Sequence, residues 1–338
     1  MYKWLLISFL VVIVAPTFAA ESNYRVLKRV QLGGEGGWDL LALDSDAGKL
    51  YISRSTRVMV VDINSEKIVG EIPDTPGVHG IAVAKDLNRG FISAGKLDSA
   101  VVFDLQTLKI IGQVKTGSNP DAILYDSATK RVFVFNGRSK NVTVIDAGTL
   151  KVAGTIELRG KPELASAAGN GKIFVNIEDT GEVLEIESSK LEVSKRFSIK
   201  PCEEPSGIGY DPLHHHIFSG CHNKIMTVLD TETGKVISTL PIGEGVDGNG
   251  FDPVTGLAFS SNGDGTLTIV KEISPGSFKV VETVKTERGS RTMIIDPKSH
   301  NIYLPVAAFS PAPAATPEVP RPRPVMIKDT FGLLVVGK

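Results

Sequence analysis

The sequence repeats itself at an interval of about 42 residues, and this repeat constrains the fold more than any other feature. An apolar cluster ending in an acidic residue recurs at 58–62, 100–104, 142–146, 183–187 and 226–230, so the acids are 42, 42, 41 and 43 residues apart. Apolar runs precede and follow each cluster. Short runs of β-branched and aromatic residues between turn signals are typical of strands. Each unit therefore predicts four short strands joined by three turns.

Seven such units account for almost the whole chain. Radial repetition of four-stranded units at this period is typical of a β-propeller. The sequence therefore predicts an all-β fold, a seven-bladed β-propeller with four antiparallel strands per blade. A linear β-solenoid is the alternative, although its rungs are normally shorter.

The two ends of the chain predict how the ring closes. Residues 24–32 have the pattern of a fourth strand, and residues 331–337 that of a third strand that lacks its fourth. The N-terminal strand would then close the last blade and remove an exposed sheet edge. We expect residues 24–338 to form one domain, with a Pro-rich loop over 308–327 inserted in the last blade. Such a loop is extended or disordered and exposed, either as a passive surface loop or as a partner-binding peptide.

Residues 1–19 have the pattern of a secretory signal peptide. Lys3 precedes an apolar run over 4–15, and small residues offer a cleavage site after Ala19. A membrane anchor is the alternative, but a spanning helix needs about 20 apolar residues and this run is shorter. We expect a periplasmic or secreted monomer with no transmembrane segment after cleavage.

Export implies an oxidising compartment, where disulfides persist. Cys202 and Cys221 are the only cysteines, and the two loops that carry them are expected to be neighbours in blade five. A disulfide between them is predicted, with two free buried cysteines as the alternative. His222 follows Cys221 on the side of the channel mouth. The formal net charge of −1 gives no clustered basic face, so nucleic acid is not expected as a partner.

In a propeller the first strand of every blade lines the central channel, so residues at its start should converge on one mouth. We call this set the mouth residues: Asp39, His79, Asp121, Glu163, Ser206, Asp247 and Arg291. Carboxylates confined together raise one another's pKa or favour a bound cation. Oxygen ligands suit calcium or magnesium, and His79 would admit zinc or manganese. The alternative is that these side chains only hydrogen-bond neighbouring blades.

The candidate metal ligands are therefore Asp39, Asp121, Glu163, Asp247 and His79; a divalent cation is possible and no other cofactor is predicted. Trp38 is a further candidate for ligand binding at the rim, with core packing as the alternative. The run 214–216, three histidines, is expected in a solvated turn on the opposite face, where at most two of them share a side.

The repeat also resembles a known family. Asp62, Asp104 and Asp146 are each followed by a turn that carries Ser or Thr and then Lys, and residues 50–53 and 132–136 loosely match the YVTN motif. The chain resembles the YVTN-type seven-bladed β-propeller repeat family over nearly all of its length. That resemblance implies an exported or surface-associated protein and no particular activity. Single-stranded nucleic acid binding rests on family analogy alone.

The function predicted from these observations is an exported scaffold that binds a small-molecule ligand or a protein partner on the mouth face, without catalysis. The alternative is a metal-assisted hydrolase or lyase of the lactone or uronate-sugar type, with His79 as general base.

Overall fold

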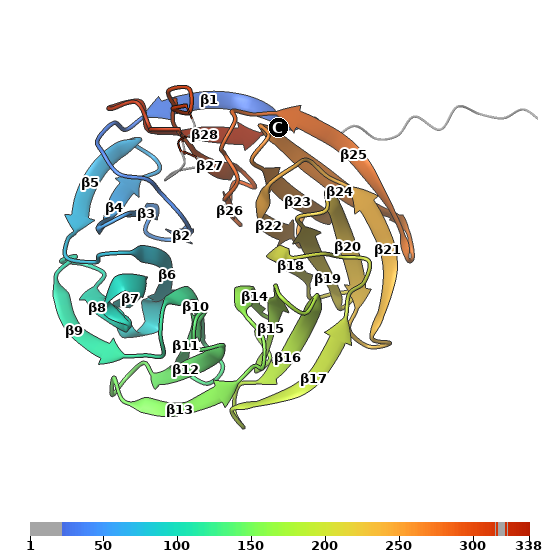
Figure 1. The fold of residues 1–338 in the computed structure, drawn as a ribbon, viewed down its shortest axis with the longest axis horizontal. Helices are drawn as coiled ribbons and strands as arrows, with labels where there is room; N and C mark the ends of the chain where they lie inside the picture. Colours follow the sequence, from blue (N-terminus) through green and yellow to red (C-terminus); the bar gives the residue numbers. More distant parts are fainter. Residues whose placement is uncertain (1–21, 315, 317–321, 323) are drawn as a thin grey trace, which may run out of the picture.

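The computed structural model describes residues 22–314, 316, 322 and 324–338, so the signal peptide predicted over 1–19 lies outside the described residues. Within them, 28 strands form seven four-stranded antiparallel sheets around a central axis (Figure 1). The predicted seven-bladed β-propeller is confirmed. The helices of this part are two 3-10 turns, η1 (Lys85–Leu87) and η2 (Gly95–Leu97). No helix in the described ranges is long and apolar enough to cross a membrane.

Blades one to three follow the chain, each with its first strand at the channel and its fourth at the outer edge (Figure 1). Blade one contains β2 (Leu41–Asp44), β3 (Lys49–Arg54), β4 (Arg57–Asp62) and β5 (Lys67–Ile72). Blade two contains β6 (Val78–Ala84), β7 (Arg89–Ala94), β8 (Ser99–Asp104) and β9 (Ile110–Lys115). Blade three contains β10 (Pro120–Asp126), β11 (Arg131–Asn136), β12 (Asn141–Asp146) and β13 (Val152–Glu157).

Blades four to six continue the same order. Blade four contains β14 (Pro162–Ala167), β15 (Lys172–Ile177), β16 (Glu182–Glu187) and β17 (Glu192–Ser198). Blade five contains β18 (Pro205–Asp211), β19 (His216–Cys221), β20 (Ile225–Asp230) and β21 (Lys235–Pro241). Blade six contains β22 (Val246–Asp252), β23 (Leu257–Asn262), β24 (Thr266–Ser274) and β25 (Ser277–Lys285).

Blade seven is built from both ends of the chain. It contains β26 (Ile294–Ile295), β27 (Ile302–Val306), β28 (Gly332–Gly337) and, as its outer strand, β1 (Arg25–Gln31). β1 pairs antiparallel with β28, so that Val30 lies opposite Leu333. The predicted closure of the last blade by the N-terminal strand is therefore confirmed.

The core lies between neighbouring blades. The second and third strands are buried on both faces, whereas the fourth strands expose most of their residues. Tyr51 of β3 packs against Phe103 of β8 with ring centroids 5.7 Å apart, which joins blade one to blade two. Gly90 makes room for this contact, because a Cβ there would lie 2.0 Å from the Phe103 ring. Burying one such aromatic side chain contributes roughly 1.5–3 kcal/mol.

The turn between first and second strands follows a fixed chemistry in several blades. In blade three the Asp126 carboxylate accepts the Ala128 N–H at 3.3 Å and the Thr129 hydroxyl at 2.7 Å. In blade six Asp252 accepts the Thr255 hydroxyl at 2.7 Å in the same way. An aspartate that opens such a turn satisfies backbone donors that would otherwise be free.

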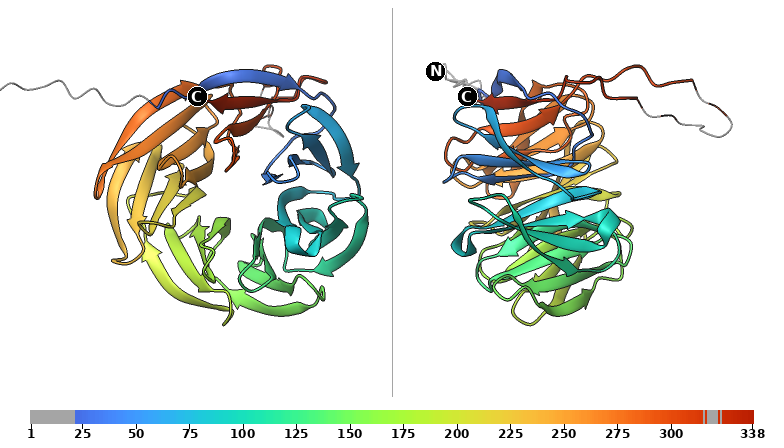
Figure 2. Two further views of the ribbon diagram at one scale, coloured as in Figure 1. Left: turned by 180° about the vertical axis from the view of Figure 1, so that it is seen from behind. Right: turned by 90° about the vertical axis from the view of Figure 1, so that its left-hand side faces the viewer.

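The described residues of the segment inserted between β27 and β28 project from the ring (Figure 2). Phe309 forms an isolated antiparallel bridge with Met326 at its base, and residues 311–314 are exposed. Residues 315, 317–321 and 323 of the predicted Pro-rich loop lie outside the described residues.

Removing β1 should open the ring. A chain that begins at Leu32 leaves the β28 edge unpaired, and the loss of about six ladder hydrogen bonds should lower the melting temperature by roughly 10 °C and promote oligomers. Calorimetry and size-exclusion chromatography measure both effects, with a chain that begins at Ser22 as control. A peptide of residues 22–31 should restore the melting temperature, whereas a scrambled peptide should not. A monomeric truncated protein of unchanged melting temperature would contradict closure by β1.

Candidate functional site at the channel mouth

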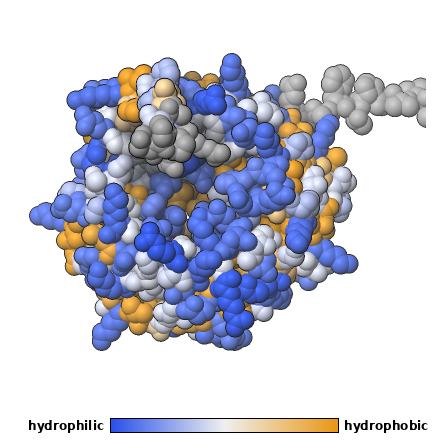
Figure 3. Space-filling view, viewed as in Figure 1, coloured by the Kyte–Doolittle hydropathy of each residue, from blue (hydrophilic) through white to orange (hydrophobic). Residues whose placement is uncertain are grey.

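The ring brings all seven mouth residues to one cavity of about 380 Å³. The lining also includes three charged or titratable side chains that do not belong to the predicted set, Lys161, Glu178 and His222. On the face that Figure 3 shows, mostly hydrophilic residues surround the centre of the ring. Residues separated by up to 252 positions in the sequence therefore share one polar cavity.

The position of each mouth residue follows from the phase of its strand. In blades two to six the first residue of the inner strand is buried and the second lines the cavity, as for Val78 and His79 or Pro120 and Asp121. Glycine often comes next and lets adjacent inner strands approach. A Cβ at Gly207 would lie 2.5 Å from the Asn249 backbone nitrogen.

Polar side chains on second strands hold the mouth backbone from the neighbouring blade. The Ser93 hydroxyl of β7 donates to the carbonyl of Asp121 in blade three, and the Ser261 hydroxyl of β23 donates to that of Arg291 in blade seven. Asn176 of β15 donates to the Ser206 carbonyl in blade five at 2.9 Å. These bonds cross from one blade to the next and fix where the mouth residues stand.

A first side-chain network spans blades one to three. His79 Nδ1 lies 2.7 Å from Asp39 Oδ2 and 3.7 Å from Asp121 Oδ1. The hydrogen bond with Asp39 raises the pKa of His79, although burial opposes this shift. Burial raises the pKa of Asp121 to about 6, because the nearby His79 only partly offsets the loss of solvation.

A second network spans blades five to seven. The Ser206 hydroxyl donates to Asp247 Oδ1 at 2.8 Å, and Arg291 Nε lies 3.0 Å from Asp247 Oδ2. Burial raises the pKa of Asp247, and the Arg291 guanidinium opposes the shift. The Asp247 carboxylate therefore joins three consecutive blades.

Blade four contributes a network of its own. Lys161 Nζ lies 2.8 Å from Glu163 Oε1 and also bonds Glu178. Burial raises the pKa of Glu163, although the bond to Lys161 opposes it. Glu178 directly follows β15, the second strand of its blade, just as His222 directly follows β19, so this shared position is a sequence signal for Glu178. Lys161 carries no such signal, because its role depends on where its side chain folds back.

Three of the five candidate metal ligands come together. One ligand atom each from Asp39, His79 and Asp121 lies within 4.8 Å of the others. Glu163 and Asp247 lie outside this group and are engaged by Lys161 and Arg291. The predicted set of five is therefore divided between three separate networks.

Trp38 does not line the cavity. Its ring packs 5.4 Å from that of Phe331 and 5.9 Å from that of Phe309, measured between centroids. The structure thus places Trp38 against aromatic side chains of blade seven and of the segment that follows β27.

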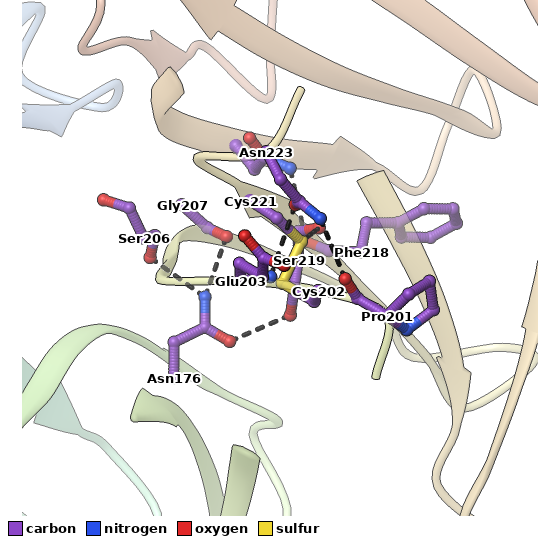
Figure 4. Close-up of a disulfide and its surroundings, with 11 residues drawn as sticks. Asn176, Pro201, Cys202, Glu203, Ser206, Gly207, Phe218, Ser219, Cys221 and Asn223 are labelled. Atoms are coloured by element: carbon purple, nitrogen blue, oxygen red, sulfur yellow. Dashed lines mark hydrogen bonds between the residues drawn. A yellow bond between two sulfur atoms is a disulfide. The ribbon is translucent and has the colours of Figure 1, made fainter. Parts of the chain in front are cut away.

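Cys202 and Cys221 form a disulfide at the blade-five side of the mouth (Figure 4). It joins the loop that leads into β18 to the end of β19. The Asn223 side chain donates to the Pro201 carbonyl at 2.8 Å and adds a second link between the same loops. Two links, the disulfide and this hydrogen bond, therefore hold the loop that leads to Ser206.

The fold and the cavity define the class of protein, a seven-bladed β-propeller with an acidic mouth. No family model matches the sequence. No curated protein matches it either. Hydrazine synthase from Kuenenia stuttgartiensis has a similar structure, with a TM-score of 0.71, 18% sequence identity, and coverage of 81% of this chain and 93% of that chain. At this identity the likeness shows the fold, and 1789 chains of solved structures match, so the fold does not indicate one activity.

The raised pKa of Asp121 predicts a pH-dependent stability. Its folded-state pKa of about 6 exceeds the reference value of 3.8, so the folded protein binds more protons between these pH values. The free energy of unfolding then falls as the pH rises through this window. Asp121→Asn lacks the titrating group. Its free energy of unfolding, relative to that of wild type, should therefore rise by about 1–2 kcal/mol from pH 4 to pH 7.

Urea unfolding at both pH values measures this gain, with the exposed Glu232→Gln as control. A difference between Asp121→Asn and wild type that stays constant with pH would show that the Asp121 carboxyl titrates normally.

Replacing both cysteines with serine should loosen one rim without opening the ring. A disulfide that closes a loop of about 20 residues contributes about 3 kcal/mol in the chain-entropy view. We expect faster amide hydrogen exchange at 201–207 and 221–224 in Cys202→Ser/Cys221→Ser, with unchanged exchange in β10. Unchanged exchange at both loops, or two free thiols in the wild-type protein by mass analysis, would argue against the bridge.

Proposed function

We propose that this propeller binds a small, polar, positively charged ligand in the mouth cavity and does not transform it. The observation that carries the proposal is the composition of that cavity, in which carboxyl groups outnumber the permanently charged cations. The carboxyl groups belong to Asp39, Asp121, Glu163, Glu178 and Asp247, and the permanent cations to Lys161 and Arg291. A free small molecule and a basic side chain of a partner protein both present the required charge.

The pKa shifts support a cation as the ligand. Burial favours the protonated forms of Asp121 and Asp247, and a bound cation would compensate for that burial and favour the ionised forms. Binding should then release protons. Protonated His79 would repel a cationic ligand, so binding should also favour the loss of the His79 proton.

Affinity for a cationic probe should therefore rise between pH 5 and pH 7. Isothermal titration calorimetry with spermidine, putrescine and arginine tests this, and buffers of different ionisation enthalpy report the released protons. Asp247→Asn and Glu163→Gln should each weaken binding about tenfold, or about 1.4 kcal/mol. Glu232→Gln, at an exposed turn away from the cavity, is the matched control.

Two results would refute the proposal. One is the absence of binding by all three probes at millimolar concentration. The other is an affinity that the mouth variants and Glu232→Gln lower equally.

A second candidate function is a metal-assisted hydrolase or lyase that acts on a lactone or a uronate-type sugar. The grouping of Asp39, His79 and Asp121 favours it, because a divalent ion held by these ligands could polarise a carbonyl group. Titration with Ca²⁺, Mn²⁺ and Zn²⁺ separates the two candidates. A cation that binds wild type but not His79→Ala would support the second.

We further propose that the protein is exported and is related to the YVTN-type repeat proteins. The disulfide supports export, because such bonds persist in oxidising compartments. Fractionation of cells that produce the full chain, with mass analysis of the mature N-terminus, tests both export and cleavage after Ala19.

A further inference from the structure

A second group of possible metal ligands lies away from the mouth, at the other end of blade five. It consists of Asp211, His214, His216 and Glu272, each of which offers one ligand atom within 4.8 Å of the others. Ser206 lines the mouth near the start of β18 and Asp211 ends that strand, so roughly 16 Å separate the two places. We call this group the blade-five cluster; it is independent of the mouth cavity.

The contacts inside the blade-five cluster are short. His214 Nδ1 lies 2.7 Å from Asp211 Oδ2 and 3.7 Å from Glu272 Oε2, and His216 Nδ1 lies 3.9 Å from the same Glu272 oxygen. The two imidazole rings are stacked with centroids 5.8 Å apart. His215 points away and bonds the Tyr210 hydroxyl at 3.0 Å, so only two of the three histidines share a side.

In the blade-five cluster, an imidazole takes the place of the hydroxyl that bonds the turn aspartate in blade six. Asp211 opens its turn as Asp252 does in blade six, and accepts the Leu213 N–H at 2.8 Å through Oδ1. In blade six the hydroxyl of Thr255 then bonds the second carboxylate oxygen, but in blade five an imidazole, that of His214, stands in this position. The scaffold thus needs only a hydroxyl there.

The same comparison applies to His216. It faces Asp211 across the β18–β19 pair, where blade six has Leu257 facing Asp252. An apolar side chain is therefore compatible with the fold at this position. Neither His214 nor His216 is needed to form the turn.

Glu272 reaches the cluster because one hairpin is longer than its counterparts. β24 and β25 have nine residues each, whereas β20 of blade five has six. Glu272 lies on this extension, and its Oε1 accepts the Gly276 N–H at 2.7 Å. The other oxygen, Oε2, is the one that faces His214 and His216.

One ligand atom of the cluster is buried without a hydrogen-bond partner. His216 is 8% exposed, and its Nδ1 makes no hydrogen bond. The Phe278 ring packs edge-on against the imidazole, with centroids 5.5 Å apart. The expected solvated turn is therefore wrong for His216, which is buried, whereas His214 is exposed and His215 is half-buried. An unsatisfied buried nitrogen is unfavourable, and coordination of a cation would satisfy it.

We propose that the blade-five cluster binds one divalent transition-metal ion of the zinc type. Two imidazoles with two carboxylates suit zinc better than calcium or magnesium, which prefer oxygen ligands. Around a tetrahedral zinc ion, ligand atoms lie roughly 3.3 Å apart, and the cluster distances of 2.7, 3.7 and 3.9 Å lie on both sides of this value. Four protein ligands complete the shell, so the ion links blade five to the long hairpin of blade six.

Metal titration of the whole protein tests the site. Chelator-treated protein without an affinity tag is titrated with Co²⁺, whose visible absorption reports tetrahedral coordination, and Zn²⁺ is then added in competition. We expect one ion per chain and a higher melting temperature in Zn²⁺. His214→Thr and His216→Leu introduce the residues that blade six carries, so the fold should persist. Each should weaken binding at least about tenfold, and Glu272→Gln should do likewise.

Two control variants make the result specific. His215→Ala removes the histidine that points away, and His79→Ala removes the histidine that contacts Asp39 at the mouth; both variants should bind the ion as wild type does. The proposal is overturned if wild type binds neither ion, if His215→Ala loses as much affinity as His214→Thr, or if His79→Ala abolishes binding. These variants leave the mouth carboxylates intact, so failure here would not bear on the ligand proposed for the mouth.

Discussion

The pairing of β1 with β28 is the interaction on which the rest of the structure depends. The two strands come from opposite ends of the chain, and their hydrogen bonds complete the seventh sheet. Without them the ring would have a free edge at β28, and blades one and seven would keep only the packing and hydrogen bonds between their facing strands. The mouth cavity needs both blades, because Asp39 belongs to one and Arg291 to the other.

Closure also explains why the mouth can hold so many charged groups. Buried charges are costly unless they are paired and hydrogen-bonded. Two of the pairs here run between blades, from Asp39 to His79 and from Asp247 to Arg291, so the same contacts satisfy the charges and join the sheets. The pairing is incomplete, since the pKa of Asp121 remains raised. A cation bound at the mouth, as proposed above, would offset this burial of Asp121.

The parts of this structure that depend on backbone periodicity could be predicted from the sequence. The repeat gives the phase of every inner strand, and that phase alone places His79 and Asp121 on the same rim. The partners of these residues could not be predicted in the same way. Lys161 reaches Glu163 and Glu178 through a long flexible side chain whose direction no spacing reveals.

Structure that departs from the repeat is harder still to predict from the sequence. The buried position of His216 depends on Phe278 and on the β24–β25 hairpin, whose strands have nine residues each where β20 has six. Trp38 illustrates the opposite case: it is next to Asp39 in the chain, yet its ring lies against Phe331 instead of the cavity.

The pKa of Asp121, measured with and without a charge on blade six, shows most directly whether distant blades share one cavity. Carbon-13 NMR titration of aspartate-labelled protein gives this pKa in wild type and in Asp247→Asn. We expect a pKa of about 6 for Asp121 in wild type and a lower pKa in the variant, because the Asp247 carboxylate repels that of Asp121 across the mouth. A normal pKa in wild type, unchanged when Asp247 is neutralised, would contradict it.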